Sequence, residues 1–206
     1  MSLYSRHILP HLIRKACSSA TITRERAEIV PAAEGVVLEI GAGGGLNLPH
    51  YDRDRVARVL GLDISPELLR TATQTARATG LNFEPLLMDA AEIPLERHAV
   101  DTVLVTFSLC SISDLDSALG EMRRVLRPGG RLLFCEHGAA PDAGVRRVQD
   151  VLTPVWKRVG GGCHLNRDAP ERIQAAGFRV EALAQAYLPQ TWRFVGYVSR
   201  GVARPG

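Results

Sequence analysis

Residues 37–47 read Val37-Leu38-Glu39-Ile40-Gly41-Ala42-Gly43-Gly44-Gly45-Leu46-Asn47, an apolar run that ends in a cluster of glycines. This pattern predicts a strand that runs into a tight turn and then into a helix. Glycine accepts positive φ angles and lets a ligand lie against bare backbone, and the first N–H groups of a helix bind polar or anionic atoms. We therefore expect a ligand-binding loop over residues 41–45.

Two common nucleotide-binding loops do not fit this stretch. The dinucleotide pattern Gly-x-Gly-x-x-Gly needs its third glycine at position 46, where this chain has Leu46. The Gly-x-x-x-x-Gly-Lys-[Ser/Thr] pattern of a nucleoside-triphosphate P-loop occurs nowhere in the chain. A nicotinamide dinucleotide is therefore disfavoured, and a P-loop is excluded.

Short apolar runs alternate with longer helical patterns along the chain, which is typical of an α/β fold. The predicted parallel strands cover residues 36–40, 56–64, 82–88, 100–106 and 131–136. Each is almost continuously apolar, as expected where helices cover both faces of a Rossmann-like sheet. The predicted helices cover residues 66–79, 114–126, 144–159 and 169–176. Two further strand-like runs, 178–187 and 193–202, predict a C-terminal hairpin. This hairpin is expected to lie antiparallel to the other strands and to complete a seven-stranded sheet.

Composition indicates one globular domain over residues 1–206, with an N-terminal helical segment (1–34) and a ligand-binding core (35–206). We expect the N-terminal segment to pack on the domain; the alternatives are a lid over the active site or a weak membrane-surface contact. The net charge of +3 is spread along the chain, so we expect no nucleic-acid partner. No apolar stretch approaches the length of about 20 residues that spans a bilayer, and the first 20 residues lack the unbroken apolar core of a secretory signal. These features favour a cytoplasmic location.

The cysteines are scattered, without the spacing of a zinc motif, so we expect free thiols and no metal site. The four are Cys17, Cys110, Cys135 and Cys163.

Four features, in order, resemble the class I S-adenosylmethionine-dependent methyltransferases. They are Glu39-x-Gly41-x-Gly43-x-Gly45, Gly61-Leu62-Asp63-Ile64-Ser65, Met88-Asp89-Ala90-Ala91 and the turn over residues 126–132. The resemblance implies that the methionine part of S-adenosylmethionine lies along the glycine loop, with Glu39 near its ammonium group. It implies that Asp63 binds the ribose and that the Asp89-Ala90 pair reads the adenine. A carboxylate in an apolar strand favours a cationic companion, because burial alone raises its pKa.

The predicted cofactor-binding residues are Glu39, Gly41, Ala42, Gly43, Gly45, Asn47, Asp63, Ile64, Asp89, Ala90 and Thr106. Asn47 is either a ligand contact or a residue of the local turn. The product of the implied reaction is S-adenosylhomocysteine.

The second half of the chain resembles the methyltransferase-like thiol S-methyltransferases and their bacterial relatives, some of which are described as phospholipid methyltransferases. The matching segments are residues 106–113, 135–140, 148–156 and 162–167. The chain departs from the mammalian branch in lacking a hydrophobic N-terminal anchor and in having His164 where that branch has Asn. The motifs of DNA amino-methyltransferases and of protein arginine methyltransferases are absent after residue 106.

A thiol acceptor needs little help, because a thiol with a pKa of about 8.5 is already partly ionised at neutral pH. A base then supplies only about 2 kcal/mol, which one histidine can provide. His137 and His164 are the candidates for this catalytic role, and each also has a purely structural interpretation. Cys110 and Cys163 read as small buried apolar residues.

Three functions follow. The first is S-methylation of a small thiol, and the second is methylation of a lipid amine, such as a phospholipid, or of a quinone. The third is a non-catalytic regulatory module that binds S-adenosylmethionine.

Overall fold

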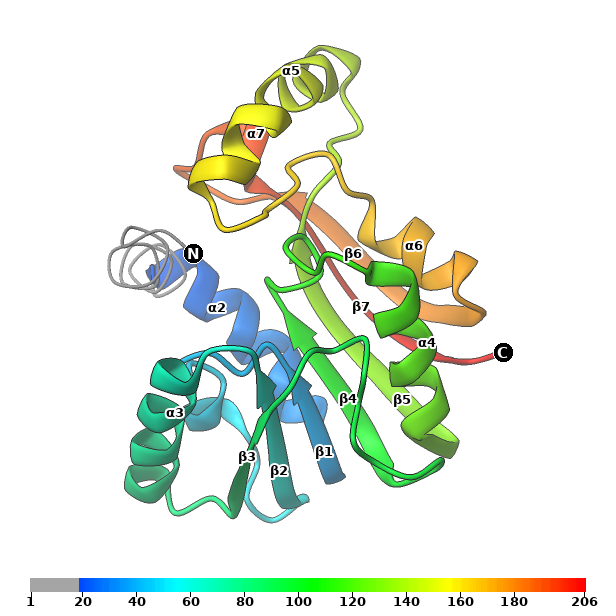
Figure 1. Cartoon of the computed structure of the whole chain (residues 1–206). Coiled ribbons are helices and arrows are strands. Elements are labelled where there is room, and N and C mark those ends of the chain that lie inside the picture. The colour runs from blue at the N-terminus through cyan, green and yellow to red at the C-terminus, as the bar shows by residue number, and fades with distance from the viewer. Residues whose placement is uncertain (1–18) are drawn as a thin grey trace.

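The computed structural model describes residues 19–206, which form one twisted sheet with helices on both sides (Figure 1). The strands are β1 (Gly35–Ile40), β2 (Val56–Asp63), β3 (Phe83–Leu87), β4 (Val100–Thr106), β5 (Leu126–His137), β6 (Phe178–Tyr187) and β7 (Tyr197–Pro205). Residues 1–18 of the expected N-terminal helical segment, including Cys17, lie outside the described residues, and the possible role of this segment as a lid stays a prediction.

The strands lie in the order β3-β2-β1-β4-β5-β7-β6, which confirms the predicted Rossmann-like sheet. Strands β1 to β5 pair in parallel, and β7 is inserted antiparallel between β5 and β6. Within the hairpin only β7 runs against the five parallel strands, since β6 returns in their direction. The last strand begins at Tyr197 rather than at residue 193, because residues 193–196 form a short helix whose N–H groups bond to the carbonyl of Trp192.

The helices are α2 (Ala20–Ile29), α3 (Pro66–Thr79), α4 (Leu115–Val125), α5 (Ala143–Val159), α6 (Ala169–Ala175) and α7 (Arg193–Gly196). The side chain of Ser65 accepts the N–H of Leu68 in the first turn of α3, and Asp114 accepts the N–H of Ser117 in the first turn of α4. Gly80 ends α3 in a left-handed conformation with φ of 69°. These capping residues are those that define the helices in the sequence. None of the helices within residues 19–206 has the length and apolar character to cross a bilayer.

Alternate residues of each central strand enter opposite layers of the core. In β1, Leu38 and Ile40 pack in the layer that contains Met122 of α4. Val37 enters the other layer, which contains Ala72 of α3 and Ile29 of α2. The sheet is therefore held between α4 and α6 on one face and α2 and α3 on the other, as predicted for strands covered on both sides.

The helix expected directly after the glycine loop is absent, and a single 3-10 turn, η3 (Leu48–His50), takes its place. Pro49 explains the difference, because proline offers no N–H with which to continue a helix that starts within the loop. The chain instead closes a turn in which the N–H of His50 donates to the carbonyl of Asn47 at 2.9 Å. The loop is therefore followed by a single 3-10 turn and offers the N–H groups of its own backbone, and not those of an α-helix N-terminus.

Candidate active site

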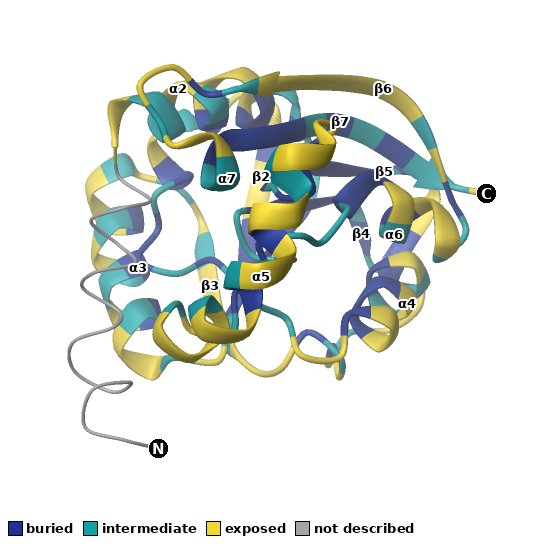
Figure 2. Ribbon diagram, turned by 90° about the horizontal axis from the view of Figure 1, so that it is seen from above, coloured by how far each residue is buried: buried dark blue, intermediate teal, exposed yellow. Residues whose placement is uncertain are grey.

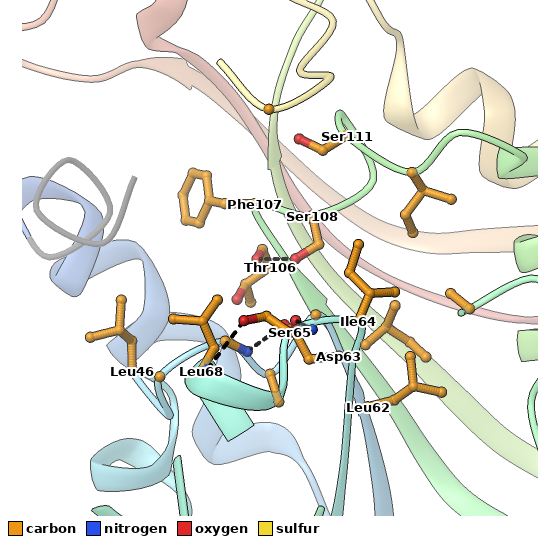
Figure 3. Close-up of a pocket in the computed structure, with 18 of the residues that line it drawn as sticks. Leu46, Leu62, Asp63, Ile64, Ser65, Leu68, Thr106, Phe107, Ser108 and Ser111 are labelled. Atoms are coloured by element: carbon orange, nitrogen blue, oxygen red, sulfur yellow. Dashed lines mark hydrogen bonds between the residues drawn. The ribbon is translucent and has the colours of Figure 1, made fainter. Parts of the chain in front are cut away.

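A cavity of about 400 Å³ opens at the carboxyl ends of β1, β2 and β4 (Figure 3). This is the edge where parallel α/β sheets bind their ligands. Its walls include eight of the predicted cofactor residues, namely Gly41, Ala42, Gly43, Asp63, Ile64, Asp89, Ala90 and Thr106. Gly45, Glu39 and Asn47 lie outside the lining, as do the two predicted catalytic histidines.

The glycine loop needs its glycines for two different reasons. Gly41 has φ of 67°, and a Cβ added to it would lie 2.2 Å from Oγ of Ser108, so a side chain here would push the loop away from the end of β4. Gly45 has φ of 79°, and its Cβ would lie 3.1 Å from the Cα of Ala72 in α3. Gly41 thus keeps the cavity floor open, whereas Gly45 lets the loop pack on α3.

Asp63 ends β2 with its carboxylate in the cavity wall (Figure 3). One oxygen accepts the N–H of Gly43 and the other accepts the N–H of Ser65, both at 2.9 Å. Burial raises the pKa of Asp63, and these backbone hydrogen bonds partly offset the rise. Because each carboxylate oxygen has a second acceptor position, the side chain can still receive hydroxyl groups from a ligand.

Apolar atoms line the cavity beside Asp63. The side chain of Ile64 is 72% exposed even though it is large and apolar. Asp89 and Ala90 follow β3 on the same wall, and the N–H of Ala91 donates to Asp89 at 2.9 Å. A flat apolar ring with polar edges would cover Ile64 and meet hydrogen-bonding groups here.

A buried polar network lies behind the glycine loop and contains both Glu39 and Asn47. The amide of Asn47 donates to Glu39 at 2.9 Å and to the hydroxyl of Thr106 at 3.0 Å. Tyr51 donates to the other oxygen of Glu39 at 2.8 Å. Burial raises the pKa of Glu39, while the hydrogen bonds from Tyr51 and Asn47 and the charge of Arg26 act against that rise. Glu39 and Asn47 therefore position the loop from beneath.

Arg26 of α2 is a site residue that the sequence interpretation missed. Its guanidinium lines the cavity, donates to Asn47 at 2.7 Å and to Thr106, and lies 5.2 Å from the centre of the Phe107 ring. Its Nε atom is buried and has no hydrogen-bond partner among the described residues. The sequence could have indicated Arg26, because this residue lies one helical turn from both Ile22 and Val30, on the apolar face of the helix.

The loop after β4 forms the opposite wall, through Phe107, Ser108 and Ser111. Phe107 has φ of 53°, a left-handed backbone that a bulky residue rarely adopts and that often marks a functional site. Glu136 holds this loop, because one of its oxygens accepts the N–H groups of Ser108 and Leu109 at 2.7 and 3.1 Å. Burial raises the pKa of Glu136 to about 8. Glu136, like Glu39, is an acidic residue within an apolar strand, so the sequence could have identified it as a site residue.

The two predicted catalytic histidines lie beyond that loop. Nδ1 of His164 donates to the carbonyl of Cys110 at 3.0 Å, so the neutral ring keeps an unprotonated Nε2. Nε2 of His137 lies 3.2 Å from Sγ of Cys163. The pKa of Cys110 is held well below its ordinary value, first by a hydrogen bond from the Cys163 thiol and then by the charge of His137. The catalytic role of either histidine stays a prediction.

Comparison with known proteins agrees with this geometry. A family model described as "Methyltransferase domain" matches residues 38–134. The chain is 34% identical to the thiol S-methyltransferase TMT1B of Rattus norvegicus over 79% of this chain and 68% of the relative. It is 36% identical to a phosphatidylethanolamine N-methyltransferase of Cereibacter sphaeroides over 66% of this chain and 68% of that one. These alignments therefore leave about a third of each relative unmatched.

The fold is similar to that of a solved chain from a complex between the Haloferax volcanii Trm112 methyltransferase activator and a methyltransferase. The TM-score is 0.72 at 19% identity, and the match covers 97% of this chain and 98% of the other.

Proposed function

The chain belongs to the class I S-adenosylmethionine-dependent methyltransferases, and from this premise we propose that it methylates the sulfur of a small thiol. S-Adenosylmethionine, when bound, supplies an electrophilic methyl group on a sulfonium that is already a good leaving group. The protein must then bind the two reactants in line and exclude water.

The cavity has the features that this cofactor needs. Its volume of about 400 Å³ lies within the usual range for a ligand pocket. Asp63 offers acceptor positions for ribose hydroxyls, and the exposed Ile64 offers an apolar surface for the adenine. Arg26 supplies a buried cation with an unpaired N–H, which suits the carboxylate of the methionine part. The residues present therefore fit the cofactor that the family uses.

The composition of the acceptor end supports a thiol. We define the acceptor end as the lining residues Phe107, Ser108, Ser111, Ile112, Ser113 and Gly161. These residues offer hydroxyls and apolar atoms but no carboxylate, so they suit a small neutral acceptor better than a cationic amine. This uncharged wall, opposite Asp63, is the observation on which the thiol assignment rests, and the likeness to a thiol S-methyltransferase agrees with it.

His164 is the residue we assign to the thiol proton. Its Nδ1 is fixed on the carbonyl of Cys110, which leaves Nε2 to accept a proton, and Gly161 of the same loop lines the cavity. His137 is the weaker candidate, because its Nε2 already contacts Cys163. As a thiolate also forms unaided at higher pH, the requirement for His164 is greatest near neutral pH.

An acceptor screen with methyl-labelled S-adenosylmethionine and the full chain tests this proposal. Simple alkyl thiols are expected to yield labelled thioethers. Since the base supplies about 2 kcal/mol, His164→Asn is expected to lower the rate about 30-fold at pH 7 and less at pH 9. His98→Asn serves as the matched control, because His98 precedes β4 at the edge of the sheet opposite the cavity. Absence of product from every thiol, with cofactor binding shown by calorimetry, would refute the thiol assignment and leave a binding module or another acceptor.

A lipid acceptor is the second candidate, because large apolar residues of α5 are exposed to solvent, and Figure 2 shows the exposed parts of this helix. These residues are Val148, Val151, Val155 and Val159, and Trp192 is 73% exposed nearby. The exposed cations Arg147, Lys157 and Arg158 lie on the same helix, as in helices that bind anionic membranes. This candidate would be favoured if the protein sedimented with phosphatidylglycerol vesicles and the double variant Val151→Ser/Val155→Ser did not. Methylation of a phospholipid or a quinone in the acceptor screen would establish it.

A further inference from the structure

Three potential metal ligands from distant parts of the chain converge behind the acceptor end. Cys110 lies in the loop after β4, His137 ends β5, and Cys163 lies in the loop between α5 and α6. The two sulfurs and a ring nitrogen of His137 all lie within 4.8 Å of one another. Nε2 of His137 is 3.2 Å from Sγ of Cys163. Both cysteines are buried, at 4% and 8% exposure, and neither is in a disulfide.

The surrounding backbone holds these three segments together. The N–H of His164 donates to the carbonyl of Cys110 at 2.8 Å, which joins the two cysteine loops. The N–H of Ala139 donates to the carbonyl of Arg167 at 3.1 Å, and the guanidinium of Arg167 donates to the carbonyl of Ile112 at 2.9 Å. The cluster is therefore preorganised by the fold, which is what a ligand set needs in order to bind an ion without ordering a loop.

The hydrogen bonding of His137 is incomplete for a histidine that serves only the fold. Its Nδ1 atom is buried and has no partner among residues 19–206. Its side-chain partners are the thiols of Cys163 and Cys110, which are weak hydrogen-bonding groups. Buried polar atoms are normally paired, so such an arrangement points to a role beyond packing.

We propose that Cys110, His137 and Cys163 bind a thiophilic divalent cation of the zinc type. Two thiolates and an imidazole are ligands that zinc prefers, with bonds of about 2.3 Å to sulfur and 2.0–2.1 Å to nitrogen. On one tetrahedral ion two sulfurs lie about 3.8 Å apart and a sulfur and a nitrogen about 3.6 Å apart. The observed atoms, all within 4.8 Å of one another with one pair at 3.2 Å, therefore need shifts of no more than about 1 Å. Two thiolates also neutralise the charge of the ion, which makes burial of the site acceptable.

Three protein ligands leave a fourth coordination position, as in catalytic zinc sites. Ser111 has its hydroxyl 3.4 Å from Sγ of Cys110 and also lines the main cavity. Gly161, two residues before Cys163, lines the same wall. The metal site therefore borders the acceptor end, but its existence does not depend on which acceptor the enzyme uses.

Metal binding can be measured directly on the reduced full chain without a histidine tag. The isolated protein is assayed for zinc by mass spectrometry, and the chelated protein is then titrated with Co²⁺ and back-titrated with Zn²⁺. We expect one ion per chain, visible d–d bands of tetrahedral cobalt, and a near-ultraviolet charge-transfer band from bound thiolate. Cys110→Ser, Cys163→Ser and His137→Gln should each weaken Zn²⁺ binding at least about 100-fold, more than loss of an outer-shell partner does.

Matched variants separate a lost ligand from a lost fold. Cys135→Ala removes a buried thiol outside the cluster and Cys17→Ser removes the remaining one, and both should keep Zn²⁺ affinity. Binding of S-adenosylhomocysteine, followed by calorimetry, should persist in all variants and shows that each is folded. Absence of Co²⁺ and Zn²⁺ binding by the reduced chain would overturn the proposal, as would unchanged affinity in the two cluster cysteine variants. The proposal would also be overturned if the isolated chain contained a Cys110–Cys163 disulfide and still bound no metal after that disulfide was reduced.

Discussion

Nη1 of Arg26 donates to Oδ1 of Asn47 at 2.7 Å, and this bond joins α2 to the end of the glycine loop. Asn47 in turn donates to Glu39 beneath the loop, so one buried chain of hydrogen bonds connects the helix with β1. Buried networks of this kind are rigid when every member is paired. The single unpaired Nε of Arg26 is therefore a specific opening for a ligand.

Arg26→Gln is expected to weaken S-adenosylhomocysteine binding about 10- to 100-fold, because a hydrogen bond to a charged group contributes about 1.5–3 kcal/mol. Calorimetry measures the change. Arg24→Gln, an exposed substitution on the same helix, should leave the affinity unchanged. Equal affinities in both variants would remove Arg26 from the cofactor site.

Cofactor affinity should also depend on the charge of Asp63. Burial raises the pKa of this carboxyl, and only the ionised form accepts hydrogen bonds at both oxygens. Affinity is therefore full above the raised pKa and falls as the pH decreases through it, so the decline begins at a higher pH than for an ordinary aspartate.

Calorimetric titrations with S-adenosylhomocysteine from pH 7.5 downwards would show this decline. Asp63→Asn should bind about 10- to 100-fold more weakly at pH 7.5 and should lack the acid limb. A variant that follows the wild-type curve would assign the pH dependence to another group.

Gly41→Ala is expected to destabilise the protein and to abolish cofactor binding. The substitution places a Cβ 2.2 Å from Oγ of Ser108 and forces a left-handed backbone on alanine, which costs about 1–2 kcal/mol before any clash. Gly120→Ala in α4 is the control, since nothing lies within 4 Å of its added Cβ. There the change should raise stability by up to about 1 kcal/mol. Thermal unfolding compares the two, and the prediction fails if both variants shift in the same direction.

Gln149→Leu should loosen α5. Gln149 is fully buried, accepts the N–H of Ala140 at 2.9 Å, and donates to the carbonyls of Gly138 and Phe194 at 2.9 and 3.1 Å. Leucine would leave these backbone groups unpaired, at about 1–3 kcal/mol for each buried group. Urea unfolding should show the loss, whereas Gln174→Leu, at an exposed position in α6, should be nearly neutral. A neutral Gln149→Leu would mean that water replaces the lost bonds.

The strands, helix caps and glycine loop were predictable because their signals are local. Ser65 and Asp114 cap the helices that follow them within a few residues, and Gly41 needs its positive φ within a contiguous motif. One local error came from Pro49, which prevents a helix where the glycine pattern favoured one, and another from residues 193–196, which form a short helix and not the start of the last strand. The effect of Pro49 is itself local, since proline lacks the N–H that the next helical hydrogen bond needs.

The sequence by itself determined the α/β sheet, the succession of its strands along the chain, and the glycine loop at its carboxyl edge. These features were predictable because hydrophobic periodicity and glycine conformation act over a few residues. Only the tertiary structure decided that Arg26 enters the cavity, that Glu136 holds the loop after β4, and that Cys110, His137 and Cys163 meet. The last three lie on separate segments whose spacing resembles no metal motif. Their proximity arises because adjacent parallel strands deliver their carboxyl ends to one edge, and the packing of the loops there sets which side chains touch.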